Sequence, residues 1–224
     1  MGLAPRPERV KFKGMYEGQT VYVLGSGASL NWIDARFFTD KLCVAVNFIS
    51  LELGVDVEFI AGHYHLDAIA ISEALPDQTV IVPEMDQGGT KLAPHAPTSG
   101  NVWSFPTREQ MYEAFNVDEH WPTEPDHLVV GPTSLHFAMH FAAYVVGPTG
   151  AVVLVGADCG RVDGKANRDG HDPGTSWPWD VWAEQLPRVA DRIRATGTQV
   201  FSLNPFVNFA LEGHSYRSTS VNIN

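Results

Sequence analysis

Short apolar runs alternate with helical segments along most of the chain. Six runs are rich in β-branched and other apolar residues and predict strands at 21–24, 42–46, 58–61, 79–83, 151–155 and 199–203. Unbroken apolar runs of four or five residues are typical of strands covered on both faces. Three longer segments have helical composition or spacing, at 67–75, 133–146 and 179–196. This alternation predicts an α/β fold: a Rossmann-like parallel sheet with helices on both faces.

The alternation stops between residues 84 and 127. This segment is rich in proline, contains Trp103 and Trp121, and lacks sustained periodicity apart from a short helical stretch at 108–115. A segment of that length inside a compact domain is more often a lid or binding insertion than a plain connection. We therefore expect one domain over residues 1–224 with a lid-like insertion at 84–127, and a surface insertion is the alternative.

The first predicted strand runs directly into a glycine turn. Gly25 and Gly27 permit a tight turn and close approach of a ligand, and Ser29 is placed to cap the short helix that follows. A helix N-terminus at the open edge of a sheet offers N–H groups to a phosphate. Leu30 replaces the third glycine of the dinucleotide fingerprint, and Asn47 stands where a ribose-binding carboxylate is usual. A nucleotide site is favoured over a purely structural turn, and NAD is the poorer candidate.

Composition narrows the class of protein. Fifteen basic and 26 acidic residues give a formal net charge of −11, which argues against a broad nucleic-acid-binding face. No apolar run approaches the roughly 18–20 residues of a membrane span, and the first residues show no secretory signal. Cys43 and Cys159 lie in or just after apolar runs and are expected to be buried free thiols. These features predict a cytoplasmic protein.

Histidines and aspartates suggest metal sites that their spacing does not support. His136 and His140 lie four apart on a predicted helix, but no HExxH or Glu-x-x-His pattern accompanies them, so packing or surface placement is favoured. His63 and His65 follow a predicted strand, where a ligand contact and a surface role are equally open. The aspartates of the glycine-rich loop 156–177 fit no EF-hand, and solvated turn residues are favoured.

The order of these motifs resembles the bacterial family 42 sialyltransferases and the related motility-associated glycosyltransferases. Residues 25–30, Gly-Ser-Gly-Ala-Ser-Leu, are similar to the family's G-x-G-P-S-L, with alanine in place of proline. Asn47 matches an asparagine that contacts the nucleotide, and Thr133 and Ser134 match a pair beside it. Gly156 and Asp158 match the Gly-x-Asp motif. Gly170-His171 matches a pair whose histidine is the catalytic base.

The resemblance implies a glycosyltransferase that moves a sugar from a nucleotide sugar to an acceptor hydroxyl, with His171 as general base. It implies nucleotide contacts from Gly25, Ser26, Gly27, Ser29, Asn47, Thr133, Ser134 and Asp158. The family's leaving-group tyrosines are missing after Asp158, and Arg161 or Lys165 is the candidate replacement on grounds of charge.

No Asp-x-Asp follows a strand, so no metal and no cofactor beyond the nucleotide sugar is expected. The acceptor is open: a glycan, a protein, a small molecule or a hydroxylated base of modified DNA. Two alternatives remain: a hydroxymethylpterin pyrophosphokinase-like diphosphotransferase, whose family shares the G-x-G-P-S-L opening, and a non-catalytic nucleotide-binding module. The diphosphotransferase would need acidic Mg²⁺ ligands at strand ends, and Asp158 is the only clear candidate in the sequence.

Overall fold

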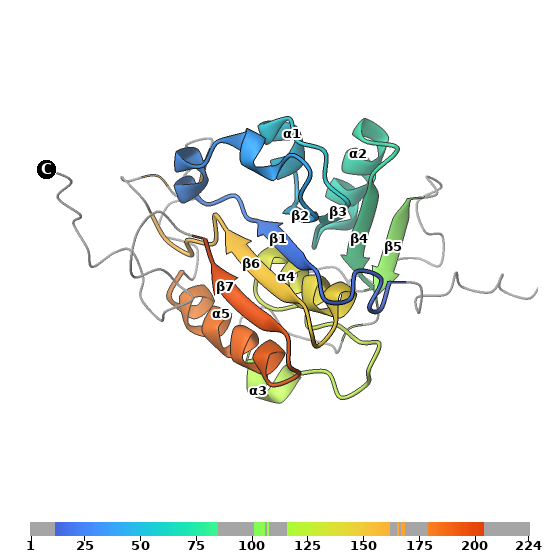
Figure 1. Ribbon diagram of the computed structural model, residues 1–224, viewed down its shortest axis with the longest axis vertical. Helices are drawn as coiled ribbons and strands as arrows, with labels where there is room; N and C mark the ends of the chain where they lie inside the picture. Colours follow the sequence, from blue (N-terminus) through green and yellow to red (C-terminus); the bar gives the residue numbers. More distant parts are fainter. Residues whose placement is uncertain are drawn as a thin grey trace, which may run out of the picture.

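Seven strands form one sheet in the computed structural model (Figure 1). The structure describes residues 12–84, 101–105, 107, 116–161, 165, 167–168 and 179–203. The strands are β1 (Thr20–Leu24), β2 (Cys43–Val46), β3 (Phe59–Ala61), β4 (Thr79–Pro83), β5 (Val102–Phe105), β6 (Ala151–Val155) and β7 (Gln199–Ser202). Every neighbouring pair is parallel, in the order β5-β4-β3-β2-β1-β6-β7. The predicted Rossmann-like α/β fold is confirmed.

Helices cover both faces of this sheet. One face carries the short α1 (Ile49–Leu53) and α2 (His65–Ala74), and the other carries α4 (Ser134–Val146) and α5 (Trp179–Arg194) (Figure 1). Two short 3₁₀ helices, η2 (Ala28–Trp32) and η3 (Ala35–Phe38), follow β1. A four-residue helix, α3 (Val117–His120), precedes α4.

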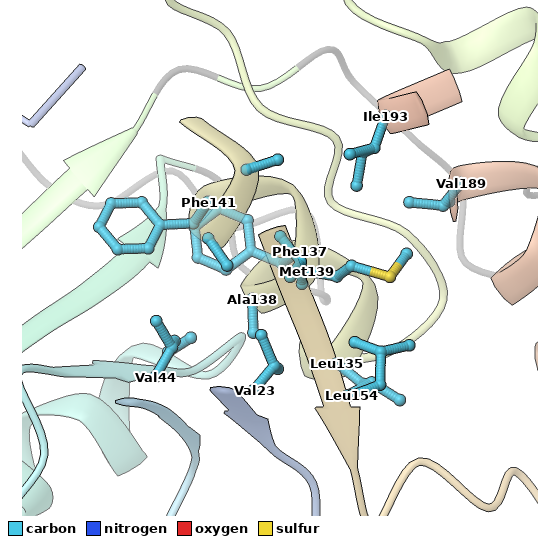
Figure 2. Close-up of a cluster of buried hydrophobic side chains, with 14 of the residues drawn as sticks. Val23, Val44, Leu135, Phe137, Ala138, Met139, Phe141, Leu154, Val189 and Ile193 are labelled. Carbon is cyan, nitrogen blue, oxygen red and sulfur yellow. The ribbon is translucent and has the colours of Figure 1, made fainter. Parts of the chain in front are cut away.

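Alternate strand residues enter two separate cores. Val23 and Val44 point toward α4, whereas Leu24 and Ala45 belong to the core on the α1 and α2 face. The larger core lies between the sheet, α4 and α5, where Phe137, Phe141 and Ile193 are among the side chains drawn in Figure 2. Eleven of the thirteen residues of α4 are buried, which fits its nearly continuous apolar sequence.

The C-terminal end of α4 is closed by the turn before β1. The N–H groups of Gly14, Tyr16 and Gly18 donate to the carbonyls of Tyr144, Val145 and Val146, at 2.9–3.0 Å. The last carbonyls of a helix have no partner within it, so this turn supplies the bonds that they need. The turn therefore fixes β1 relative to α4.

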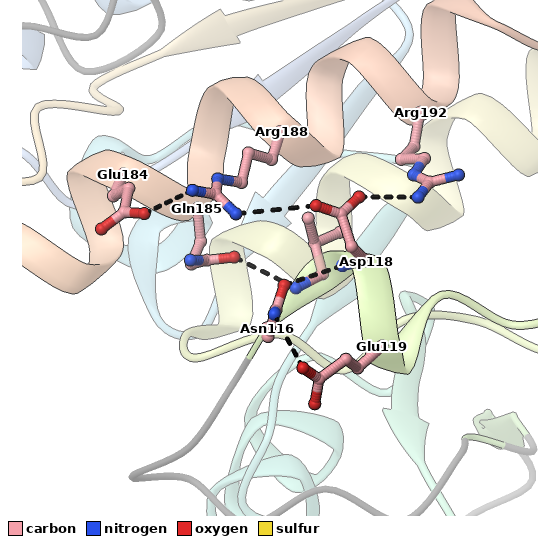
Figure 3. A network of polar contacts seen from close by, with 8 residues as sticks. Asn116, Asp118, Glu119, Glu184, Gln185, Arg188 and Arg192 are labelled. Carbon is pink, nitrogen blue, oxygen red and sulfur yellow. Dashed lines mark hydrogen bonds and ion pairs between the residues drawn. The ribbon is translucent and has the colours of Figure 1, made fainter.

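Parts of segment 84–127 are built into the fold. Residues 102–105 form β5, which pairs with β4 at the edge of the sheet. Asn116 caps α3 through Asp118 N–H, and Gln185 of α5 accepts a hydrogen bond from Val117 N–H at 3.1 Å (Figure 3). Arg188 and Arg192 of α5 pair with Asp118 (Figure 3). The sequence analysis predicted neither β5 nor α3. A lid role for this segment stays a prediction, and residues 108–115 lie outside the described residues.

Candidate functional site

A cleft of about 220 Å³ lies at the carboxyl ends of β1, β2 and β6. The chain builds outward from β1 through β2 to β5, then returns to place β6 on the other side of β1 (Figure 1). Open α/β sheets bind their ligands at the carboxyl ends of the strands where the winding reverses. The cleft therefore occupies the place where this class of fold puts a binding site.

Seven of the eight candidate nucleotide-binding residues line this cleft. They are Gly25, Ser26, Gly27, Asn47, Thr133, Ser134 and Asp158. They come from four segments: the turn after β1, the end of β2, the start of α4 and the loop after β6. The eighth candidate, Ser29, is fully buried and is not among the described lining residues.

The glycine turn lies directly on the backbone after β6. Gly25 N–H donates to Val155 O at 2.7 Å, and Gly27 N–H donates to Gly156 O at 2.9 Å. A Cβ on Gly25 or Gly27 would lie 2.5 Å from Gly156 O, well inside van der Waals contact. The sequence analysis assigned these glycines to a tight turn and to the close approach of a ligand. The structure shows that contact between two backbones already requires them.

Asp158 holds the residue that follows this turn. Its Oδ2 accepts from Ser29 N–H at 2.8 Å, and its Oδ1 accepts from the Ser29 hydroxyl. The expectation that Ser29 caps the short helix is wrong, because Gly27 is the N-cap residue of η2 and Ser29 lies inside it. Burial raises the pKa of Asp158 above its ordinary value, and the two bonds from Ser29 act in the opposite direction. Asp158 therefore acts mainly as a clamp between β6 and η2.

Asn47 has two unusual features. Its backbone has φ 53°, in the left-handed region that asparagine tolerates better than most residues, and its N–H donates to Ala61 O at 2.9 Å. Its side-chain Oδ1 is shielded from water and has no hydrogen-bond partner in the described part of the chain. A buried polar atom of this kind calls for a partner, and because Asn47 lines the cleft, rotation of its carboxamide toward a hydrogen-bond donor of a ligand would supply one.

The first turn of α4 forms another wall of the cleft. Thr133, Ser134 and Leu135 line it. Thr133 is the N-cap residue but its hydroxyl makes no capping bond, and its Oγ1 instead lies 2.8 Å from His136 Nδ1. The N-terminal turn of a helix carries N–H groups without partners inside the helix and a partial positive charge. This wall therefore favours an anionic group.

Asp158 is the one charged side chain among the described residues that line the cleft. Arg161 is half-buried and Lys165 is exposed, and neither belongs to that lining. Their assignment to the leaving phosphate stays a prediction. His171 and Gly170 lie outside the described residues, so the general-base assignment also stays a prediction.

Cys159 follows Asp158 in the lining of the cleft. Its backbone has φ 44°, and burial together with the nearby Asp158 raises the pKa of its thiol to about 12. A thiol with that pKa stays protonated near neutral pH and is a poor nucleophile. Cys43 is buried as well, and both cysteines are free, as the sequence predicted.

Three of the described histidines make hydrogen bonds within the fold. His63 Nε2 lies 3.0 Å from Val130 O, and His65 Nε2 lies 3.0 Å from Pro83 O. His140 Nδ1 accepts from Val129 N–H at 2.9 Å, and its ring stacks on Trp121. The contacts of His63 and His140 tie Val129 and Val130, before α4, to the rest of the fold, and the contact of His65 ties α2 to the end of β4. No group of three or more potential metal ligands occurs among the described residues. His136 is fully buried, and His140 is partly buried and stacked on Trp121, which is the packing side of the expected packing or surface placement.

Four residues that sequence reasoning missed also line the cleft: Tyr64, Asn167, Trp179 and Trp182. Trp179 and Trp182 lie in the first turn of α5, with ring centroids 5.0 Å apart. Their i, i+3 spacing directly after the polar loop was an available signal that both side chains share one face of the helix beside the site. The sequence gave no such signal for Asn167, because the composition of the loop is typical of solvated turns.

The comparisons with known proteins add little. No protein-family model and no curated protein matches the chain. Among solved structures, BdcA in complex with NADPH is 14% identical over 84% of this chain and 70% of that one, with a TM-score of 0.28. A short-chain dehydrogenase from Oenococcus oeni PSU-1 is 10% identical over 84% and 78%, with a TM-score of 0.25. Scores this low carry no argument, so the fold assignment rests on the strand order.

Among the described residues, no helix is both long enough and apolar enough to span a membrane.

Proposed function

We propose that the cleft binds the nucleotide of a nucleotide sugar and that the protein transfers the sugar to an acceptor hydroxyl. One observation carries the proposal. Residues from four segments, separated by up to 133 positions between Gly25 and Asp158, converge on one cleft at the reversal of the sheet. These are the positions that match the glycosyltransferase motifs, and the cleft sits where such folds bind nucleotides.

The walls of the cleft suit the parts of a nucleotide. The first turn of α4 offers N–H groups to a phosphate without adding a cation. Trp179 and Trp182 provide apolar surface for a base or sugar ring. The side-chain Oδ1 of Asn47 accepts no hydrogen bond from the described part of the chain, so it could accept one from a ligand. Turnover also needs a base for the acceptor hydroxyl, and His171 is the proposed one, since an imidazole with an ordinary pKa near 6.5 suits proton removal at neutral pH.

The rival diphosphotransferase needs carboxylates that hold Mg²⁺. Both oxygens of Asp158 are engaged by Ser29, and no other carboxylate is found among the described residues that line the cleft. The geometry therefore favours glycosyl transfer without a metal over transfer of pyrophosphate.

The test is turnover of CMP-, UDP-, GDP- and ADP-sugars. It is measured as the rate at which free nucleotide is released, with and without EDTA. We expect one donor class to be turned over, at least by slow hydrolysis, at equal rates in EDTA. The His171→Ala variant should lose roughly 10²–10⁴-fold in kcat and keep its donor affinity. Nucleotide binding without turnover of any donor would refute the proposed glycosyltransferase activity and support a non-catalytic nucleotide-binding module.

A further inference from the structure

The loop after β6 returns to the glycine turn at residues 167 and 168. Asn167 forms an antiparallel bridge with Gly27, and Arg168 N–H donates to Ser26 O at 2.8 Å. The Ser26 hydroxyl donates to Asn167 Oδ1 at 3.3 Å. The turn after β1 therefore lies between two pieces of the same connection, residues 155–158 on one side and residues 167–168 on the other.

Two further residues, Asn31 and Glu52, hold Arg168 from outside the turn. Asn31 of η2 donates through Nδ2 to Arg168 O at 3.1 Å. The Arg168 guanidinium lies 3.8 Å from the Glu52 carboxylate and 3.4 Å from Glu52 O, on α1. Both side chains of this ion pair are about one-third exposed. Arg168 thus connects the loop to η2 and α1 as well as to the turn.

We propose that Asn167 and Arg168 are positioning residues for the nucleotide cleft, a role that rests on the proposed function. Asn167 lines the cleft, and it keeps that place only while this pair stays on the turn. The backbone bond to Ser26 O also fixes the orientation of the Ser26–Gly27 peptide group, in the turn that lines the cleft. The sequence analysis gave neither residue a role.

Coupling follows from this arrangement. A nucleotide bound against Ser26 and Gly27 stabilises the conformation of the turn that accepts Arg168 N–H, so it also stabilises residues 167–168 on the turn. By linkage, contacts that hold residues 167–168 raise nucleotide affinity by the same factor. Asn31 and Glu52 reach the cleft through Arg168, since neither is among the described residues that line it.

The experiment compares Asn31→Ala and Arg168→Ala with the wild type. The probe is whichever of CMP, UDP, GDP and ADP binds the wild type most tightly in titration calorimetry. We expect each variant to raise Kd by about fivefold or more, a typical size for coupling between sites. Arg168→Lys, which keeps the charge opposite Glu52, should recover part of the affinity. Arg192→Ala removes an ion pair with Asp118 near the C-terminal end of α5, outside the described lining of the cleft, and should leave Kd unchanged.

A second readout is hydrogen exchange of the Arg168 amide. Faster exchange at this amide with an unchanged Tm reports a local change and not a general loss of stability. Nucleotide should slow this exchange in the wild type, and both alanine variants should speed it without a change in Tm. Unchanged Kd and exchange in both variants, with a nucleotide bound by the wild type, would overturn the positioning role alone. If no nucleotide binds the wild type, the proposed function fails first, and the positioning role fails with it.

Discussion

At the residue scale, the contact between the segments that follow β1 and β6 depends on residues that have no side chain or whose polar atoms are fully paired. The atoms around Gly27 leave no room for a methyl group. The buried Asp158 carboxylate accepts hydrogen bonds from both the N–H and the hydroxyl of Ser29, which is also buried. The sequence motifs matched both positions as nucleotide contacts. The structure gives each of them a role in the fold as well, and that role makes them sensitive to substitution whether or not a ligand is present.

We expect Gly27→Ala to lower the free energy of unfolding by about 1–3 kcal/mol, because the added Cβ would lie 2.5 Å from Gly156 O and 2.7 Å from Asp158 Cγ. Gly62→Ala is the matched control. Its Cβ would meet only Asn47 Oδ1, at an ordinary 3.5 Å. Urea denaturation of the two variants measures the difference. Equal stability of both would show that the turn and the β6 backbone are less closely packed than described.

Asp158→Ala should cost about 1–3 kcal/mol of unfolding free energy, because it leaves the buried Ser29 N–H and hydroxyl without their acceptor. Asp77→Ala removes an exposed carboxylate and should stay within about 0.5 kcal/mol of the wild type. Thermal and urea denaturation of both variants provide the comparison. An unchanged free energy of unfolding in Asp158→Ala would mean that the carboxylate serves a ligand and not the fold.

At the element scale, the predictable parts were those with a strong local pattern. Strands β4 and β6 have the predicted bounds, and β1, β2, β3 and β7 differ from prediction by one residue at one end. Strand β5 was missed because Val-Trp-Ser-Phe is short and follows a proline-rich stretch, so only pairing with β4 makes it a strand. Helix α3 has four residues and depends on Gln185 and two arginines of α5, which no local pattern reveals.

Helix α4 gives a pH-dependent prediction at this scale. Burial lowers the pKa of His140 to about 4 and that of His136 to about 3, and it lowers the pKa of His63, beside α4, to about 4. The unfolded chain, with ordinary values near 6.5, binds more protons between these limits. Stability is therefore complete above about pH 6.5 and is lost as the pH falls toward 4, by about 1–3 kcal/mol for each histidine.

The check is the slope of unfolding free energy against pH between 4 and 6.5 for the wild type and for His140→Asn. The asparagine oxygen can take the place of Nδ1 as acceptor for Val129 N–H, and the side chain does not titrate. We expect a smaller slope in this variant. An identical slope in the two proteins would exclude His140 as a buried neutral group.

At the scale of the whole molecule, the sequence predicted which residues meet without predicting how. Parallel strands bring their carboxyl ends to one edge, so Gly25–Gly27, Asn47 and Asp158 had to lie near one another once the fold was inferred. Thr133 and Ser134 were placed by resemblance. The return of Asn167 and Arg168 to the glycine turn was beyond prediction, because it depends on contacts between a polar loop and a turn that lies about 140 positions earlier in the chain.

The central claim is that this cleft binds a nucleotide, and calorimetric titration of CMP, UDP, GDP and ADP into the wild type and Asn47→Gly tests it most directly. Glycine tolerates the left-handed backbone of position 47, so the variant loses the carboxamide and keeps the turn. We predict that at least one nucleotide binds the wild type and that Asn47→Gly weakens it about tenfold, the equivalent of one hydrogen bond. Failure of all four nucleotides to bind at millimolar concentration, or equal affinity in Asn47→Gly, would contradict the account.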